Sequence, residues 1–156
     1  MNDIARLRVV LIDDAVRLRG LLREALGRHG FEVVGEAGDG RSGVCLVEEL
    51  SPDIVVLDLA MPGMDGLESI PQIRRRSPQT RIVVLSGFEA AHVSRRALAL
   101  GAHAYLEKGI SPRVLAATMR TVHDNGHSPV TVTAAPVEGG DVPARARMEG
   151  NPAQAG

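Results

Sequence analysis

The segment IVVLDLAMPGMDG (residues 54–66) combines a short apolar run, an aspartate directly after it, and a loop rich in proline and glycine. The run from Ile54 to Leu57 is wholly apolar, which is typical of a strand in a parallel sheet that helices cover on both faces. Asp58 is therefore expected at the carboxyl end of a central strand. In open α/β sheets this end faces the crevice in which ligands bind. The segment predicts an α/β fold with an acidic residue in that crevice.

Three further apolar runs also end at polar residues. VVLID ends at Asp13 and Asp14, IVVLS ends at Ser86, and AYLEK ends at Lys108. If these runs are strands of one parallel sheet, their carboxyl ends lie at the same edge. We therefore expect these side chains to meet Asp58 in one site.

Short β-branched runs alternate with segments of helical period between residues 8 and 124. The expected strands are 8–12, 31–36, 54–57, 81–85 and 104–106, and the expected helices are 16–28, 42–50, 67–75, 90–100 and 112–124. This alternation predicts a doubly wound, five-stranded parallel sheet with right-handed crossovers and helices on both faces. On the first helix, Leu21 and Leu22 are both expected on the buried face. Pro71 is expected in the first turn of the third helix.

Length, charge and composition limit the possible classes. A chain of 156 residues with a formal net charge of −1 has no general attraction for nucleic acid or anionic lipid. It contains no apolar stretch of about 18 residues and no signal-peptide pattern, so a cytoplasmic protein is expected. The single cysteine, Cys45, lies in an apolar stretch and is expected to be a buried, inert thiol. Residues 1–125 are expected to form one domain, and the Pro/Gly/Ala-rich residues 126–156 are expected to be a disordered tail.

The residue types at the four strand ends suit phosphoryl transfer. A carboxylate such as Asp58 can attack a phosphoryl group and hold it as an acyl phosphate. Three carboxylates in one crevice repel each other unless they hold a cation, and hard oxygen ligands suit Mg²⁺. Lys108 is the only lysine among 18 basic residues, and its compact ammonium could contact a phosphoryl oxygen, as could the Ser86 hydroxyl. Each aspartate could instead be the N-cap of the following helix.

Residues 7–125 resemble the receiver domain of bacterial two-component response regulators. The acidic pair Asp13 and Asp14, the block VVLDLAMPGMDGLE around Asp58, the strand that ends at Ser86 and the stretch GAHAYLEKG around Lys108 carry the resemblance. It implies a flavodoxin-like fold with strand order 2-1-3-4-5 and phosphorylation on Asp58.

The resemblance also implies a set of roles and partners. Mg²⁺ would be held by Asp13, Asp14, Asp58 and the backbone carbonyl of Ala60. Lys108 and Ser86 would stabilise the phosphoryl group, and Ser86 and Tyr105 would switch a partner-binding face. The implied partners are a sensor histidine kinase or phosphotransfer protein, an unknown downstream protein and a phosphorylation-dependent homodimer.

The stretch GAHAYLEKGISPRVLAATMRTV is most similar to the subfamily that usually carries a helix-turn-helix output domain. The residues after Asn125 are poorly patterned for such a domain. We therefore expect no output domain and no direct binding to nucleic acid.

Two other functions remain open. One is a receiver-like interaction module that is never phosphorylated. The other is a magnesium-dependent phosphatase of the haloacid dehalogenase type, which usually carries Asp-x-Asp-x-Thr after its first strand, where this chain has DDAVR. We expect no enzyme, apart from self-phosphorylation and self-dephosphorylation.

Overall fold

The structure is a computed structural model, and it describes residues 5–61, 66–87 and 91–125. The predicted tail, residues 126–156, lies outside the described residues. None of the described helices has the length and apolar character needed to cross a membrane.

Five parallel strands form one sheet in the order β2-β1-β3-β4-β5, which confirms the predicted fold class. The strands are β1 (Leu7–Ile12), β2 (Phe31–Ala37), β3 (Ile54–Leu57), β4 (Arg81–Ser86) and β5 (Ala104–Glu107). The helices are α1 (Val16–Arg28), α2 (Gly40–Leu50), α3 (Gly66–Arg76), α4 (Ala91–Leu100) and α5 (Pro112–Asp124). The predicted ranges of α1, β3 and α5 match the structure.

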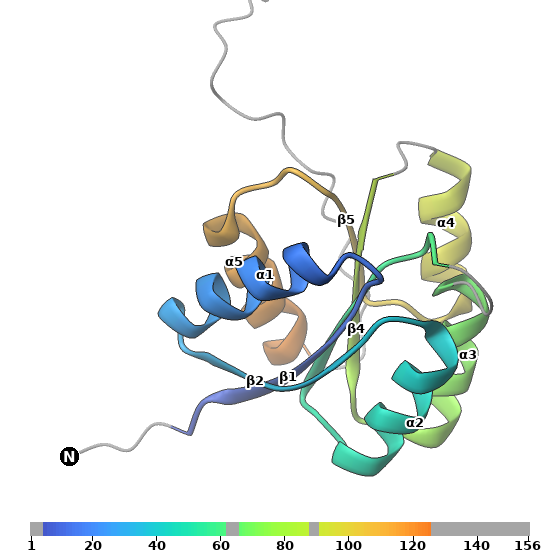
Figure 1. Cartoon of the computed structure of the whole chain (residues 1–156). Helices are drawn as coiled ribbons and strands as arrows, with labels where there is room; N and C mark the ends of the chain where they lie inside the picture. Colours follow the sequence, from blue (N-terminus) through green and yellow to red (C-terminus); the bar gives the residue numbers. More distant parts are fainter. Residues whose placement is uncertain (1–4, 62–65, 88–90, 126–156) are drawn as a thin grey trace, which may run out of the picture.

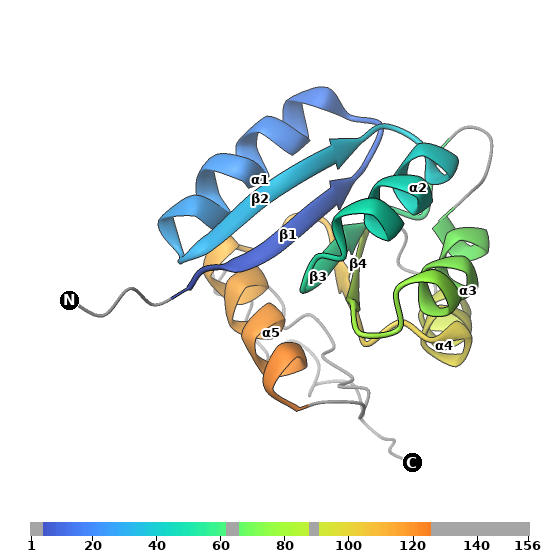
Figure 2. The same ribbon diagram turned by 90° about the horizontal axis from the view of Figure 1, so that it is seen from below.

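Helices cover both faces of the sheet, with α1 and α5 on one face and α2, α3 and α4 on the other (Figure 1). The view from below shows the same two helical layers with the sheet between them (Figure 2). Each face has its own apolar cluster, and β3 contributes alternate residues to both. All four residues of β3 are buried for this reason. The wholly apolar pattern that starts at Ile54 thus reflects a central strand with no solvent-facing side.

Polar side chains cap the N-termini of α2 and α5. The hydroxyl of Ser111 accepts a hydrogen bond from the Val114 N–H at 3.2 Å, and Pro112 occupies the first turn of α5, as the sequence predicts. Helix α2 begins two residues earlier than predicted because Asp39 caps it. A carboxylate oxygen of Asp39 accepts a hydrogen bond from the Ser42 N–H at 2.8 Å.

Two expectations about helix packing are wrong. Leu21 is 59% exposed, whereas Leu22 and Leu26 are buried against the sheet. Leu22 and Leu26 are four residues apart and lie on one face, and Leu21 is rotated away from that face. Pro71 lies in the second turn of α3, because the helix already begins at Gly66. A proline there removes one internal hydrogen bond of the helix.

Ser51, which ends α2, adopts a left-handed backbone conformation with φ of 44° and ψ of 60°. This region costs a residue with a Cβ atom roughly 1–2 kcal/mol, and glycine adopts it freely. We expect Ser51→Gly to raise the free energy of unfolding by about 0.5–1 kcal/mol, since the gain is partly offset by the greater freedom of glycine in the unfolded chain. Urea denaturation measures the change. Ser51→Ala keeps the Cβ atom and is the matched control, so an equal gain in that variant would contradict the explanation.

Candidate functional site

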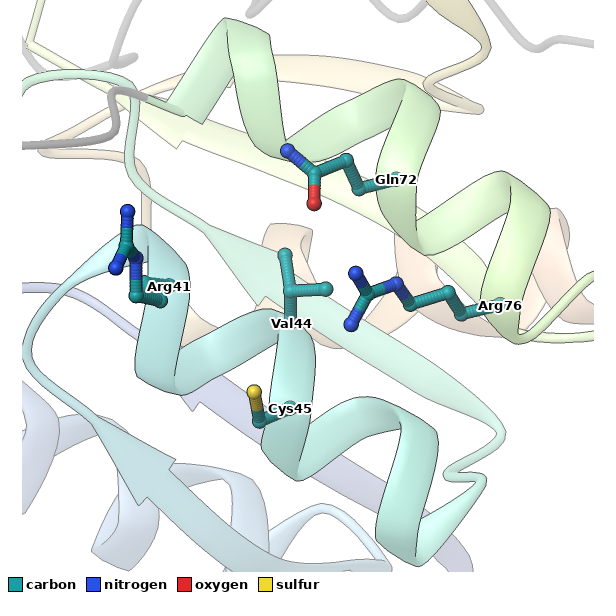
Figure 3. A pocket seen from close by; sticks show the side chains of 5 residues that line it. All are labelled: Arg41, Val44, Cys45, Gln72 and Arg76. Carbon is teal, nitrogen blue, oxygen red and sulfur yellow. The ribbon is translucent and has the colours of Figure 1, made fainter.

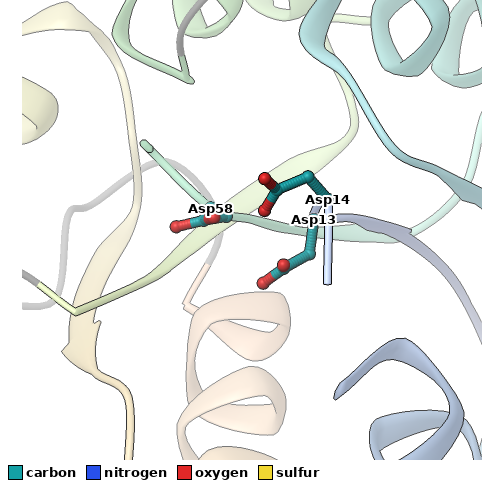
Figure 4. Close-up of side chains that lie close together, drawn as sticks. All are labelled: Asp13, Asp14 and Asp58. Atoms are coloured by element: carbon teal, nitrogen blue, oxygen red, sulfur yellow. The ribbon is translucent and has the colours of Figure 1, made fainter. Parts of the chain in front are cut away.

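The pairing of β1 with β3 brings Asp13 and Asp58 together. Ile12 pairs with Leu57 in the sheet, and the Asp58 N–H donates to the Ile12 carbonyl at 2.9 Å. Asp13 and Asp58 are 4% and 2% exposed, and Asp14 is exposed. One carboxylate oxygen from each aspartate lies within 4.8 Å of the others. Figure 4 shows the three carboxylates gathered at this edge of the sheet.

Lys108 completes the cluster from the strand end of β5. Its ammonium nitrogen lies 3.0 Å from Asp13 Oδ2 and 3.4 Å from Asp58 Oδ2. Its backbone N–H donates to the Ser86 carbonyl at 2.7 Å, which ties Lys108 to the end of β4. Ser86 is fully buried at this position. The structure therefore brings the predicted side chains to one edge of the sheet.

The two oxygens of the Asp58 carboxylate differ in their contacts. Oδ1 accepts a hydrogen bond from the Ala60 N–H at 3.3 Å. Oδ2 is buried, and within residues 5–61, 66–87 and 91–125 no donor has hydrogen-bond geometry toward it. The Lys108 ammonium at 3.4 Å thus forms an ion pair with this oxygen without a well-directed hydrogen bond. Oδ2 of Asp58 is therefore buried with an ion-pair partner but without a directed hydrogen bond.

Burial and neighbouring charges shift the pKa values of this site. Burial raises the pKa of Asp58, and the negative charge of Asp13 raises it further, against the opposing effects of Lys108 and the Ala60 N–H. Burial alone would lower the pKa of Lys108. The hydrogen bond to Asp13 and the charges of Asp58 and Asp13 outweigh burial, so the pKa of Lys108 is raised and its ammonium stays charged.

The donor set fits a divalent cation. Three carboxylates and one ammonium carry a formal charge of −3 + 1 = −2 in a partly buried site. The orphaned Oδ2 of Asp58 also offers a lone pair without a hydrogen-bond donor. Carboxylate oxygens are the ligands that Mg²⁺ prefers.

The raised pKa of Asp58 predicts a stability effect of Asp58→Asn without divalent cations. A carboxyl whose pKa is higher in the folded state binds its proton more tightly there, so stability falls as the pH rises through the unfolded and then the folded pKa. Near neutral pH, we expect Asp58→Asn to raise the free energy of unfolding by about 1 kcal/mol, the size of a typical single-site effect. Urea denaturation with a chelator measures it.

Two conditions test the cause of this gain. At a pH below the ordinary pKa of aspartate, both proteins lack the Asp58 charge, and the difference should shrink. Added Mg²⁺ should stabilise the wild-type protein more than the variant, because a ligand stabilises only the state that binds it. A gain in Asp58→Asn that is independent of pH would contradict the electrostatic explanation.

Tyr105 and Ala60, the other two predicted site residues, lie in different environments. Tyr105 on β5 is 8% exposed and packs in the apolar cluster that includes Ala97 of α4 and Val84 of β4. Ala60 is exposed and follows Asp58 by two residues. Their predicted roles in switching and in metal binding remain predictions.

Sequence reasoning missed one residue that contacts the site. Arg19 on α1 donates from Nη1 to the backbone carbonyl of Asp13 at 2.5 Å, and from Nε to Glu36 of β2 at 3.0 Å. An arginine on an amphipathic helix ordinarily indicates a solvated surface. No local pattern indicates that α1 carries this side chain to the end of β1.

A pocket of about 280 Å³ lies apart from the acidic cluster, between α2 and α3. Figure 3 shows its lining, with Cys45 on α2 and Gln72 on α3 among the residues. Cys45 is exposed, so the expectation of a buried thiol is wrong. Val44 and Val47 face the sheet instead, because the helical period of α2 leaves Cys45 on the outer side.

A parallel sheet of order 2-1-3-4-5 with three aspartates and a lysine at its carboxyl edge is the arrangement that the sequence predicts for a phosphoacceptor signalling domain. The sequence pattern of the response regulator receiver domain matches residues 9–120. The chain therefore belongs to the response regulator receiver domain family, which serves signal transduction in two-component systems.

Known proteins similar to this chain support the assignment. The chemotaxis protein CheY of Thermotoga maritima is 37% identical over 105 residues, which cover 67% of this chain and 88% of CheY. A two-component response regulator of the LuxR family from Aurantimonas sp. SI85-9A1 has a TM-score of 0.74 and 30% identity, over 79% of this chain and 89% of that chain. The CheX-CheY-BeF3-Mg²⁺ complex of Borrelia burgdorferi has a TM-score of 0.69 and 26% identity, over 74% of this chain and 88% of that chain.

Several curated relatives are longer than this chain. The chain spans 49% and 50% of the length of two transcriptional or nitrate-response regulators that it matches, and 28% of a methylesterase. The similarity to these proteins therefore covers half of their length or less.

Proposed function

We propose that this chain accepts one phosphoryl group on Asp58 and uses the modified domain to switch the binding of a partner protein. The observation that carries the proposal is the buried Asp58 carboxylate, which lies beside Asp13 and within 3.4 Å of the Lys108 ammonium. A carboxylate in this setting has an oxygen without a directed hydrogen bond that can attack, and a cation next to it. The family assignment supports the same chemistry.

The acidic residues would hold the metal that this chemistry uses. We assign the carboxylates of Asp13, Asp14 and Asp58 and the backbone carbonyl of Ala60 as its ligands. Mg²⁺ bound there would neutralise charge on the phosphoryl oxygens. The similar CheY protein of Borrelia burgdorferi is described with BeF3 and Mg²⁺, which supports the choice of metal.

The residues of the chain carry out the transfer itself. An oxygen of the Asp58 carboxylate forms a bond to phosphorus, and the bond from phosphorus to the donor breaks, with its electron pair leaving on the donor atom. The Lys108 ammonium, now paired with two carboxylates, contacts a phosphoryl oxygen as negative charge accumulates. The Ser86 hydroxyl donates to another phosphoryl oxygen. Both groups hold the product in place.

The partner-binding switch follows from the added charge. A phosphoryl group adds close to two negative charges and attracts hydrogen-bond donors. Ser86 at the end of β4 and Tyr105 on β5 are the switch residues of the proposal, and the surface of α4, β5 and α5 is the face that they alter. A sensor histidine kinase or phosphotransfer protein would supply the phosphoryl group. An unidentified downstream protein or a second copy of the chain would bind the altered face in the cytoplasm.

Intact-protein mass spectrometry after incubation with acetyl phosphate tests this function. We expect a gain of one phosphoryl group that requires Mg²⁺ and disappears on hydroxylamine treatment, because hydroxylamine cleaves acyl phosphates. The absence of an adduct with several small donors and with a cognate kinase would favour the interaction module that is never phosphorylated. Continued hydrolysis of many equivalents of a phosphate ester would instead identify a phosphatase.

A further inference from the structure

Arg19 connects three elements of the structure beneath the acidic cluster. It projects from α1, pairs with Glu36 on β2 at 3.0 Å and donates to the backbone carbonyl of Asp13 at 2.5 Å. The Arg19 side chain is 15% exposed and the Glu36 side chain is 24% exposed. The pair is therefore partly shielded from water, which strengthens it relative to a fully exposed ion pair.

The carbonyl that Arg19 contacts belongs to the peptide unit between Asp13 and Asp14. A peptide unit is planar, so fixing its oxygen also limits the positions of the Asp14 nitrogen and Cα atom. Asp13 has further restraints, since its N–H donates to Ala37 at 3.0 Å and its Oδ1 accepts from Ala15 at 2.8 Å. The side chain of Asp14 is exposed and makes no hydrogen bond or ion pair to the described part of the chain. Its orientation therefore depends on its backbone.

We propose that Arg19 is a positioning residue that, anchored by Glu36, orients the Asp13–Asp14 peptide so that both carboxylates can bind the metal together. The inference rests on the proposed function, because it assigns the metal to this cluster. Residues that hold metal ligands in place typically contribute 10- to 100-fold to metal affinity. Arg19 suits the role because its planar guanidinium can contact a carboxylate and a carbonyl at once, which a lysine ammonium on one flexible stem does less well.

Arg23 provides a matched control on the same helix. It also pairs with Glu36, at 2.6 Å through the other carboxylate oxygen, and its side chain is 51% exposed. The structure gives it no contact with Asp13. Both arginines contribute to the lowered pKa of Glu36, against the opposing effect of burial. Loss of either arginine removes an ion pair to Glu36, but only loss of Arg19 releases the Asp13 carbonyl.

The test is the affinity for Mg²⁺, measured by isothermal titration calorimetry on the full chain. We expect Arg19→Ala to weaken Mg²⁺ binding about 10-fold. Glu36→Gln should weaken it by a smaller factor, because Arg19 then keeps its contact with Asp13 but loses its charged anchor. Arg23→Ala should stay within about twofold of the wild type. Urea denaturation with a chelator should show a larger loss of stability in Arg19→Ala than in Arg23→Ala, because Arg19 loses a more shielded ion pair and also its hydrogen bond to the Asp13 carbonyl.

The outcomes separate this inference from the proposed function. If the wild type shows no saturable Mg²⁺ binding, or if the binding survives in Asp58→Asn and Asp14→Asn alike, both ideas are wrong. If the wild type binds Mg²⁺ at the cluster and Arg19→Ala binds it as tightly as Arg23→Ala, only the positioning role is wrong. If Arg19→Ala does not fold, Arg19→Lys replaces it in the titration. Wild-type Mg²⁺ affinity in both single variants, Arg19→Lys and Glu36→Gln, would also overturn the positioning role.

Discussion

Asp58→Asn is expected to abolish the phosphoryl adduct, with at least a 100-fold lower rate of phosphorylation by acetyl phosphate. An amide oxygen is a poor nucleophile, and the resulting linkage to phosphorus would be far less stable than an acyl phosphate. The substitution keeps the size of the side chain and the acceptor for the Ala60 N–H. Intact-protein mass spectrometry over a time course, with Mg²⁺ present, gives the rate.

Asp53→Asn is the control for this prediction. Asp53 lies just before β3, at the opposite end of the strand that carries Asp58, and its carboxylate accepts a hydrogen bond from the Arg8 N–H at 2.8 Å. We expect this variant to be phosphorylated at the wild-type rate. If Asp58→Asn gains the same mass at the same rate as the wild type, another residue is the phosphoryl acceptor and the assignment of Asp58 is wrong.

Gly66→Ala is expected to lower the free energy of unfolding by about 2–3 kcal/mol, the cost typical of forcing an extra carbon into a packed interior. A Cβ atom on Gly66 would lie 2.3 Å from the Asp58 carbonyl oxygen and 2.6 Å from the Leu59 Cα atom. These are backbone atoms that cannot rotate away. The Gly66 N–H also donates to the Leu59 carbonyl at 3.1 Å, so the start of α3 is tied to the segment after Asp58. Chemical denaturation measures the loss.

The same change should slow phosphorylation by about 10-fold or more, because a shift of the Asp58 backbone displaces the attacking carboxylate. Gly20→Ala on α1 is the control, since a Cβ atom at Gly20 meets no atom within 4 Å. Alanine is also the better helix former, so Gly20→Ala should raise stability by about 0.5–1 kcal/mol and leave the phosphorylation rate unchanged. Equal losses in the two variants would contradict the steric explanation.

The polar residues that follow the apolar runs could be assigned to one site from the sequence because parallel strands impose a common edge. A strand of four apolar residues such as Ile54–Leu57 can be recognised locally, and its carboxyl end follows from the direction of the chain. Asp58 and Lys108 could therefore be expected in one crevice, and the structure places the Lys108 ammonium 3.4 Å from Asp58 Oδ2. The resemblance supplied the strand order, which determines which of these ends are neighbours.

Errors arose where a local pattern allows more than one orientation. Leu21 and Cys45 each lie among apolar residues, and the helical period alone does not say which neighbour faces the sheet. The start of α2 depended on the Asp39 cap, and the start of α3 depended on the close approach of Gly66 to the Asp58 carbonyl. The Asp39 cap is a local contact with Ser42, whereas the other features depend on how a helix docks, which the period of its residues only partly restricts.

By itself the sequence determined the order and type of the helices and strands, the parallel α/β class and the set of acidic and basic residues at the strand ends, because these follow from local periodicity and chain direction. Only the tertiary structure decided how those residues contact one another. The orphaned Oδ2 of Asp58, the ion pairs of Lys108 and the contact of Arg19 with Asp13 all join residues from different elements. Such contacts depend on strand order and on helix docking, which small differences in packing free energy decide. These contacts leave no repeated pattern along the sequence.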